Sequence, residues 1–419
     1  MNARIFIKPI LTVVALAVAL TAAGHPADSS KVTHRIGVNV RPAYILPSHR
    51  FFRGENELGK RLDKSGSAHL QYSFAFPSDS RHGRMFPTAY QGIGLAWNTF
   101  CDKKEIGDPA AVYVFQGATL ARLSPKLSLD YEWNFGLSFG WHPYDPYGDF
   151  DPEFPNERNL VVGSRVNAYI NVGFLLTWNP SQYWSVSGGL DLTHFSNGNT
   201  SYPNAGVNTV GIRLGAARYF GPERQLHSTE AGRVNEYDNG HSTRMTYDVI
   251  LYGAGRAKGL FWNDTPYIAK GKFGIIGLNI NPLYRVNKFF RAGLSLDVQY
   301  DESANVGEHV AGIGDDGNIK FFRPPLGEQL GVGLSARAEF VMPIFSVNIG
   351  FGRNFIYKGN ELKGFYQTLA LKTDLYRNLF LHIGYKLHDF HDPNNLMLGL
   401  GWRFGAPSTE ALSMSCGSE

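Results

Sequence analysis

The chain has 419 residues, a formal net charge of +4 and a charged fraction of 18%. So small a charge over this length does not indicate a nucleic-acid partner. Beyond the N-terminal segment, no run of eighteen or more uncharged apolar residues occurs, which excludes a transmembrane helix there. The 47 glycines, 21 tyrosines and 29 phenylalanines favour alternating strands over helices.

The first residues have the order of a secretory signal peptide. Arg4 and Lys8 precede an apolar run over residues 10–20, and small residues follow as far as Gly24. We therefore expect residues 1–24 to be a signal peptide and the mature protein to begin near Gly24 or His25.

Apolar and polar residues alternate with period two along the whole chain, which is the pattern of strands with two different faces. In residues 127–141, every odd position is leucine or aromatic and every even position is polar or glycine. Residues 162–178 repeat the pattern. Such segments exceed the roughly 5 to 6 residues usual in soluble strands and reach the roughly 9 to 11 that a tilted transmembrane strand needs.

Sixteen candidate strands follow one another, and short turns alternate with long segments between them, as in outer-membrane barrels. The predicted fold is all-β, a transmembrane antiparallel β-barrel of about 16 strands in the bacterial outer membrane. A water-soluble sandwich with its apolar faces inward is the alternative. The candidate strands are residues 35–46, 67–76, 90–100, 110–123, 127–141, 160–178, 183–195, 207–220, 244–254, 270–281, 288–300, 329–341, 344–354, 365–375, 378–388 and 395–404.

The two halves of the chain match in strand number, as if an eight-stranded unit had been duplicated. Two tandem eight-stranded barrels are therefore the alternative to one barrel of sixteen, which we prefer because sequential hairpin pairing leaves no exposed edge. The predicted division is a signal peptide (1–24), a first eight-strand unit (31–220), a polar linker (221–243), a second unit (244–405) and a C-terminal tail (406–419).

A histidine and a serine stand two residues apart at the end of the strand predicted over residues 183–195. His194 and Ser196 share the parity of Leu190 and Leu192, so they continue its apolar, outward face. Asn208 begins the next strand on the same outward parity as Val210, Ile212 and Leu214. Three polar side chains therefore converge on a face where apolar side chains are expected.

This constellation suits ester hydrolysis, because a serine hydroxyl becomes a good nucleophile when a nearby base takes its proton. Ser196 is the candidate nucleophile and His194 the candidate base, about 7 Å apart along the strand backbone, and Asn208 is placed to orient the imidazole. Ordinary polar residues at a barrel rim are the alternative reading. Turn-forming Asn197, Gly198 and Asn204 are candidates for loop support or an oxyanion site. We expect no metal and no cofactor.

The pattern His194-x-Ser196-Asn197, followed by Pro203-Asn204-x-Gly206, resembles the signature of the lipid A 3-O-deacylases, the PagL-like family often called acyloxyacyl hydrolases, in Gram-negative outer membranes. The resemblance implies a barrel-bound carboxylic-ester hydrolase that removes an acyl chain from the lipid A of lipopolysaccharide in the outer leaflet. It implies Ser196 as nucleophile and His194 as general base. The family has a glutamate where this chain has Asn208.

Two further readings complete the expectations. A non-enzymatic channel or structural barrel that keeps a relic site is the alternative function, and a protein of this class implies the barrel-assembly machinery as a partner. His388, in the corresponding hairpin of the second half, is followed by no serine and is expected to be structural. Basic residues of the first outer loop either are solvated or meet lipid A phosphates: Arg50, Arg53, Lys60, Arg61 and Lys64.

Overall fold

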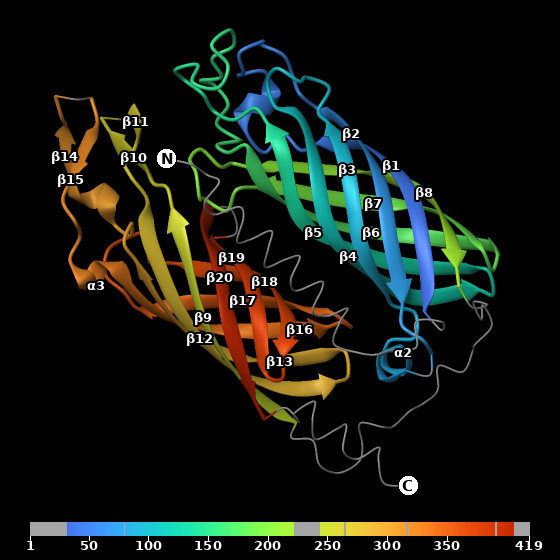
Figure 1. Cartoon of the computed structure of the whole chain (residues 1–419). Helices are drawn as coiled ribbons and strands as arrows, with labels where there is room; N and C mark the ends of the chain where they lie inside the picture. The colour runs from blue at the N-terminus through green and yellow to red at the C-terminus, as the bar shows by residue number, and fades with distance from the viewer. Residues whose placement is uncertain are drawn as a thin grey trace. The chain divides into compact units, whose positions relative to one another are not determined.

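The computed structural model describes residues 32–78, 80–221, 244–263, 265–315, 317–389 and 392–405. The predicted signal peptide, nearly all of the predicted linker and the C-terminal tail lie outside these residues. Within them, no helix is long and apolar enough to span a membrane. The chain divides into two compact units, each built around its own closed antiparallel β-barrel (Figure 1).

The first barrel closes in sequence order, because β8 pairs antiparallel with β1 and leaves no free edge. Two short helices, η2 (Arg50–Arg53) and α2 (Arg81–Met85), lie in its loops. Its strands are β1 (Thr33–Ile45), β2 (Lys64–Ala75), β3 (Tyr90–Thr99), β4 (Gly107–Ser124), β5 (Leu127–Trp141), β6 (Val166–Ser181), β7 (Trp184–Ser196) and β8 (Val207–Phe220).

The second barrel closes in the same way, by pairing of β20 with β9. Its strands are β9 (Met245–Arg256), β12 (Phe273–Asn287), β13 (Phe290–Asp301), β16 (Leu330–Val341), β17 (Phe345–Ile356), β18 (Phe365–Tyr376), β19 (Leu379–His388) and β20 (Asp392–Phe404). Its loops carry two small hairpins, β10 (Gly259–Trp262) with β11 (Thr265–Ile268) and β14 (Val310–Ile313) with β15 (Ile319–Phe321), and the short helices η3 (Val306–His309) and α3 (Leu326–Gln329).

The all-β barrel class is confirmed, but the preferred single barrel of sixteen strands is wrong and the tandem alternative is correct. The pairings of β1 with β8 and of β9 with β20 satisfy the edge strands within each half. Consequently β8 and β9 offer each other no free edge on which one larger sheet could continue.

Alternate residues along each strand point to opposite faces of the barrel wall, as expected. On β7, Leu190 and Leu192 are exposed and outward, whereas Asp191 is buried in the lumen. There it accepts hydrogen bonds and forms an ion pair with Arg41, while Arg213 pairs with Glu132. Because buried charges are costly unless paired, this network lets a polar interior exist behind an apolar wall.

The end of the first barrel that carries its long loops is closed by a hydrophobic cluster. The loops after β1, β3, β5 and β7 all lie at this end, since successive strands run antiparallel. They contribute buried side chains that cover the lumen, including Phe51 and Phe52 of η2, Phe100 and Val161, against Phe195 of β7.

Candidate active site

The candidate site lies on the hairpin of β7 and β8, at the end that carries the long loops. The strand register places His194 directly opposite Asn208, and Leu192 opposite Val210. On the other side of β7, His194 faces Ile170 of β6. The site is therefore fixed by hydrogen-bonded strands on both sides.

His194 contacts both of the polar residues that share its face. Its Nε2 lies 2.9 Å from Ser196 Oγ, and its Nδ1 lies 2.7 Å from Asn208 Oδ1. An amide oxygen only accepts, so the Nδ1 proton is donated to Asn208. The Nε2 lone pair is then free to accept the Ser196 hydroxyl proton, which is the arrangement a general base requires.

Gly206 holds the hairpin loop against the imidazole. It adopts φ +75°, in the left-handed region, and a Cβ added there would lie 3.2 Å from His194 Cε1 and 3.0 Å from the Phe195 carbonyl oxygen. Its N–H donates to the Val161 carbonyl, which ties the loop after β7 to the loop after β5. Only glycine meets both the backbone and the space requirement.

The three residues expected to support the loop have distinct surroundings. The Asn197 N–H donates to Asn204 Oδ1 at 2.9 Å, so this backbone donor is used within the loop. Gly198 adopts φ +65°, which permits the turn. Asn197 Nδ2 is buried next to Ser196 in sequence and, within the described residues, has no hydrogen-bond partner. The Asn197 side-chain amide, rather than its backbone N–H, is therefore an unused donor beside Ser196.

An apolar hollow of about 230 Å³ adjoins the imidazole on the outward face of the wall. It runs across the neighbouring strands and is continued at one edge by Leu46, whose N–H donates to the Asn208 carbonyl at 2.8 Å. Sequence reasoning missed this groove, because its members come from β5, β6, β7 and β8 and from the end of β1. Its main lining residues are Leu46, Trp133, Ile170, Val172, Leu192, His194 and Asn208.

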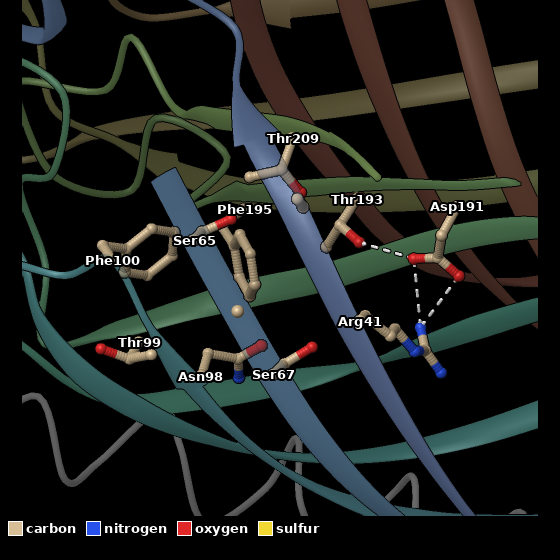
Figure 2. A pocket seen from close by; sticks show the side chains of 12 residues that line it. Arg41, Ser65, Ser67, Asn98, Thr99, Phe100, Asp191, Thr193, Phe195 and Thr209 are labelled. Carbon is tan, nitrogen blue, oxygen red and sulfur yellow. Dashed lines mark hydrogen bonds and ion pairs between the residues drawn. The ribbon is translucent and has the colours of Figure 1, made fainter. Parts of the chain in front are cut away.

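A second cavity lies on the inner side of the same strands. Figure 2 shows Thr193 and Arg41 both bonded to the Asp191 carboxylate, with Phe195 on the other side of the cavity beside Phe100. Its volume is about 20 Å³, which suffices for a single water molecule. An acyl ester therefore fits the outer groove and not the inner cavity.

Loop contacts behind the hairpin also escaped the sequence reasoning. Asn159 donates from Nδ2 to the Glu105 and His142 carbonyls and accepts the Val161 and Val162 N–H groups at Oδ1. Since Val161 accepts the Gly206 N–H, Asn159 links the loop before β4 to the hairpin. The residue types alone carry no signal for this network.

The corresponding hairpin of the second barrel has a different arrangement. His388 Nε2 donates to the Lys363 carbonyl, and Nδ1 lies 3.5 Å from Asp389. Within the described residues, no hydroxyl group is hydrogen-bonded to this imidazole. His388 thus secures the loop after β17, in line with the structural role expected for it.

Closed antiparallel barrels with apolar outer walls define the class of β-barrel proteins of the outer membrane. The first barrel bears a serine, a histidine and an amide beside an apolar groove. Family models agree with that class. The model of the lipid A 3-O-deacylases (PagL) matches residues 66–217, and that of the acyloxyacyl hydrolase C-terminal domain matches residues 245–406. The chain belongs to this family of outer-membrane ester hydrolases.

Solved structures that match the chain include two proteins of bacterial outer membranes or surfaces. The crystal structure of the outer membrane enzyme PagL is 12% identical, covers 43% of this chain and 97% of its own, and has a TM-score of 0.29. Neisserial surface protein A (NspA) is 7% identical, with coverages of 45% and 96% and a TM-score of 0.28. No curated protein sequence matches the chain.

Proposed function

We propose that the protein hydrolyses an ester-linked acyl chain of lipid A from the lipid-facing wall of its first barrel, with Ser196 as nucleophile and His194 as general base. One observation carries the proposal: His194 bonds Ser196 and Asn208 on the same outward face that forms the apolar groove. Lipid A is a membrane lipid with acyl esters, and the family match supports it as the substrate.

In the acylation step, Ser196 Oγ attacks the ester carbonyl carbon while His194 Nε2 takes the hydroxyl proton. The tetrahedral intermediate then collapses, the bond to the sugar oxygen breaks, and His194 returns the proton to that oxygen as the sugar leaves. Water, deprotonated in turn by His194 Nε2, attacks the acyl carbon, the bond to Ser196 Oγ breaks, His194 returns the proton to Oγ, and the fatty acid leaves. Each step moves one proton between Nε2 and an oxygen, so the cycle restores the starting imidazole.

Charge on the carbonyl oxygen is stabilised in this scheme by a donor from the hairpin loop. Asn197 Nδ2 is buried and unpaired within the described residues, so binding the oxyanion supplies a partner that the resting loop lacks. Asn204 and Gly198 act indirectly, by holding the Asn197 backbone in its turn.

Asn208 orients the imidazole without supplying charge. Its amide oxygen fixes the proton on Nδ1, leaving Nε2 as the base, but it does not stabilise the imidazolium electrostatically as a carboxylate would. We infer from this difference a slow esterase that retains the correct tautomer.

The acyl chain of the substrate occupies the groove beside His194. Trp133, Val172 and Leu192 occupy successive outward positions on neighbouring strands, because Val172 is paired with both of the others in the register. These side chains offer apolar contacts continuous with the hydrocarbon of the membrane. In the proposed division, residues 31–220 catalyse and residues 244–405 form a non-catalytic unit, and both require the barrel-assembly machinery.

Mass spectrometry of lipid A tests the function directly. Lipid A from cells expressing the wild-type chain should lose one ester-linked acyl group, and lipid A from cells expressing Ser196→Ala should keep it. Heat-dependent migration in gels should verify that both proteins are folded barrels. Identical lipid A in the two strains, with both barrels folded, rejects the proposal.

A further inference from the structure

The loop between β1 and β2 leaves one arginine beside the groove without an acidic partner. Its three carboxylates each pair with another cation: Glu55 with Arg50 at 3.4 Å, Asp63 with Arg61 at 3.1 Å, and Glu57 with Arg158 at 3.9 Å. Within the described residues, no carboxylate lies within ion-pair distance of Arg53.

Backbone contacts determine where Arg53 lies. It is the last residue of η2, whose Phe51 and Phe52 are buried in the cluster that closes the barrel end. His49 caps this helix by accepting the Phe51 N–H at 3.2 Å. The Arg53 backbone is therefore fixed by packing, while its side chain is exposed to the exterior.

The Arg53 guanidinium is anchored one residue from the edge of the apolar groove. Its Nη2 donates to the Pro47 carbonyl at 3.2 Å. Pro47 directly follows Leu46, which lines the groove and whose N–H is bonded to the Asn208 carbonyl. One N–H of the guanidinium is thus used for positioning, and the remaining donors of the planar fork stay available for an anion.

We propose that Arg53 binds a phosphate monoester on the sugar headgroup of the glycolipid whose acyl chain occupies the groove. This inference rests on the proposed function and extends it to the headgroup. A phosphate group accepts two parallel N–H bonds from a guanidinium, a geometry that neither a neutral sugar nor an acyl chain offers. Arg53 would then select phosphorylated glycolipids and set the headgroup at the height at which the ester reaches Ser196.

The experiment compares Arg53→Gln with Arg50→Gln, using the full-length protein in detergent micelles. Both variants remove one arginine from the same short helix, but Arg50 is already paired with Glu55. Each is assayed on phosphorylated lipid A and on the same lipid A after enzymatic removal of its phosphates. We expect Arg53→Gln to raise KM for the phosphorylated lipid at least about tenfold, with kcat unchanged, and to leave the dephosphorylated lipid unaffected.

Arg50→Gln should behave as wild type on both lipids. Equal effects of Arg53→Gln on the two lipids, or no effect on either, would overturn the inference. Failure of the proposed function is recognised separately, because the wild type would then hydrolyse neither lipid. In that case, the inference is tested by the affinity of phosphorylated lipid A for Ser196→Ala and for the double variant Ser196→Ala with Arg53→Gln. Equal affinities overturn the inference, and an affinity about tenfold lower in the double variant supports it.

Discussion

Asn208 stands at the position where the resemblance to the lipid A 3-O-deacylases implies a glutamate. Its side-chain oxygen lies 2.7 Å from His194 Nδ1, close enough to fix the tautomer. In a serine triad, replacing the acid by an amide can cost about 10⁴ in rate when the amide stabilises the wrong tautomer. Here the amide oxygen faces Nδ1, so the rate lost comes from the missing negative charge and not from a wrong tautomer.

Asn208→Asp should therefore increase the rate. The carboxylate is nearly isosteric with the amide and adds a negative charge beside the imidazolium that forms during attack, so we expect kcat for lipid A deacylation to rise about tenfold or more. Asn208→Leu, which removes the acceptor, should lower it. Steady-state hydrolysis in detergent measures both, and an unchanged or reduced rate for Asn208→Asp contradicts the role assigned to this amide.

Gly206→Ala should impair the site while the barrel stays folded. A side chain at φ +75° costs about 1–2 kcal/mol, and the added Cβ would press on the His194 ring and the Phe195 carbonyl. We expect at least a tenfold loss of activity.

Gly188→Ala is the matched control for Gly206→Ala. It lies on β7, and a Cβ there would meet Leu214 at 3.5 Å and the Arg213 carbonyl oxygen at 3.9 Å, both ordinary contacts. Both proteins should retain heat-dependent gel migration. Equal activities of the two variants would exclude a positioning role for Gly206.

The sequence was sufficient to place His194, Ser196 and Asn208 on one face, because a period of two fixes which side chains share a side of a strand. It was insufficient for Asn197, whose N–H is taken by Asn204 while its side-chain amide stays unpaired. Which of the two Asn197 donors stays unpaired depends on the conformation of the loop, which the alternation of residues along a strand does not predict. The catalytic roles of His194, Ser196 and Asn208 stay predictions.

At the scale of elements, the hairpin depends on loops from elsewhere in the barrel. Glu105 is fully buried, accepts the Leu58 N–H at Oε1 and offers its carbonyl to Asn156 and Asn159. Burial raises the pKa of this carboxyl, against the opposing effect of the Leu58 hydrogen bond, and the nearby charges of Asp102 and Glu57 raise it further.

The stability of this loop cluster should consequently depend on pH. A raised folded-state pKa means that the folded loops favour the protonated acid, so the stabilising contribution is present below the ordinary glutamate pKa and is lost as pH rises through the raised value. Hydrogen exchange of the Leu58 amide, corrected for its intrinsic rate, should therefore become faster with rising pH.

Glu105→Gln should remove this pH dependence, because it has no proton to lose. Glu55→Gln is the control: that carboxylate is exposed and paired with Arg50, so the pH dependence should persist. Identical pH profiles for wild type and Glu105→Gln would show that another group is responsible.

The strands themselves were largely predictable, since each of the sixteen expected segments overlaps a barrel strand. Two of these expected strands, residues 160–178 and 270–281, ended too early, just before or at an Asn-Pro pair. Asn179-Pro180 lies at the end of β6, and Asn281-Pro282 lies inside β12, which continues to Asn287. Gly293 of β13, which pairs with Leu283, lies against this proline: a Cβ added at Gly293 would lie 2.0 Å from the Pro282 carbonyl oxygen, so the close approach of the two strands requires glycine there.

At the scale of the whole molecule, the number of barrels was beyond the sequence. Alternation identifies strands but not the partner of the last strand, and closing β1 on β8 requires contacts nearly a whole barrel apart in the chain. One barrel of sixteen strands and two barrels of eight strands contain the same hairpins. They differ only in the pairs of strands that close each barrel. The likeness of the two halves was the sole hint.

Two barrels of eight strands also weaken the alternative of a channel. Eight strands enclose a lumen that side chains fill. In the described part of the second barrel, Lys372 and Arg403 pair with Asp248 and Glu339 across the interior. The purified protein in planar bilayers should therefore show no stable conductance. A reproducible open-channel step, absent from a control barrel prepared identically, would restore the channel as a function.

The covered end of the first barrel has a kinetic consequence. Phe51, Phe52 and Phe100 close the lumen, and the groove beside the site lies on the outer wall. Lipid A then reaches Ser196 by lateral diffusion within the membrane or micelle surface. The concentration that sets the rate is therefore the mole fraction of lipid A in that surface. Adding inert detergent at constant bulk lipid A should slow the proposed reaction by surface dilution, whereas diluting micelles of fixed composition should not.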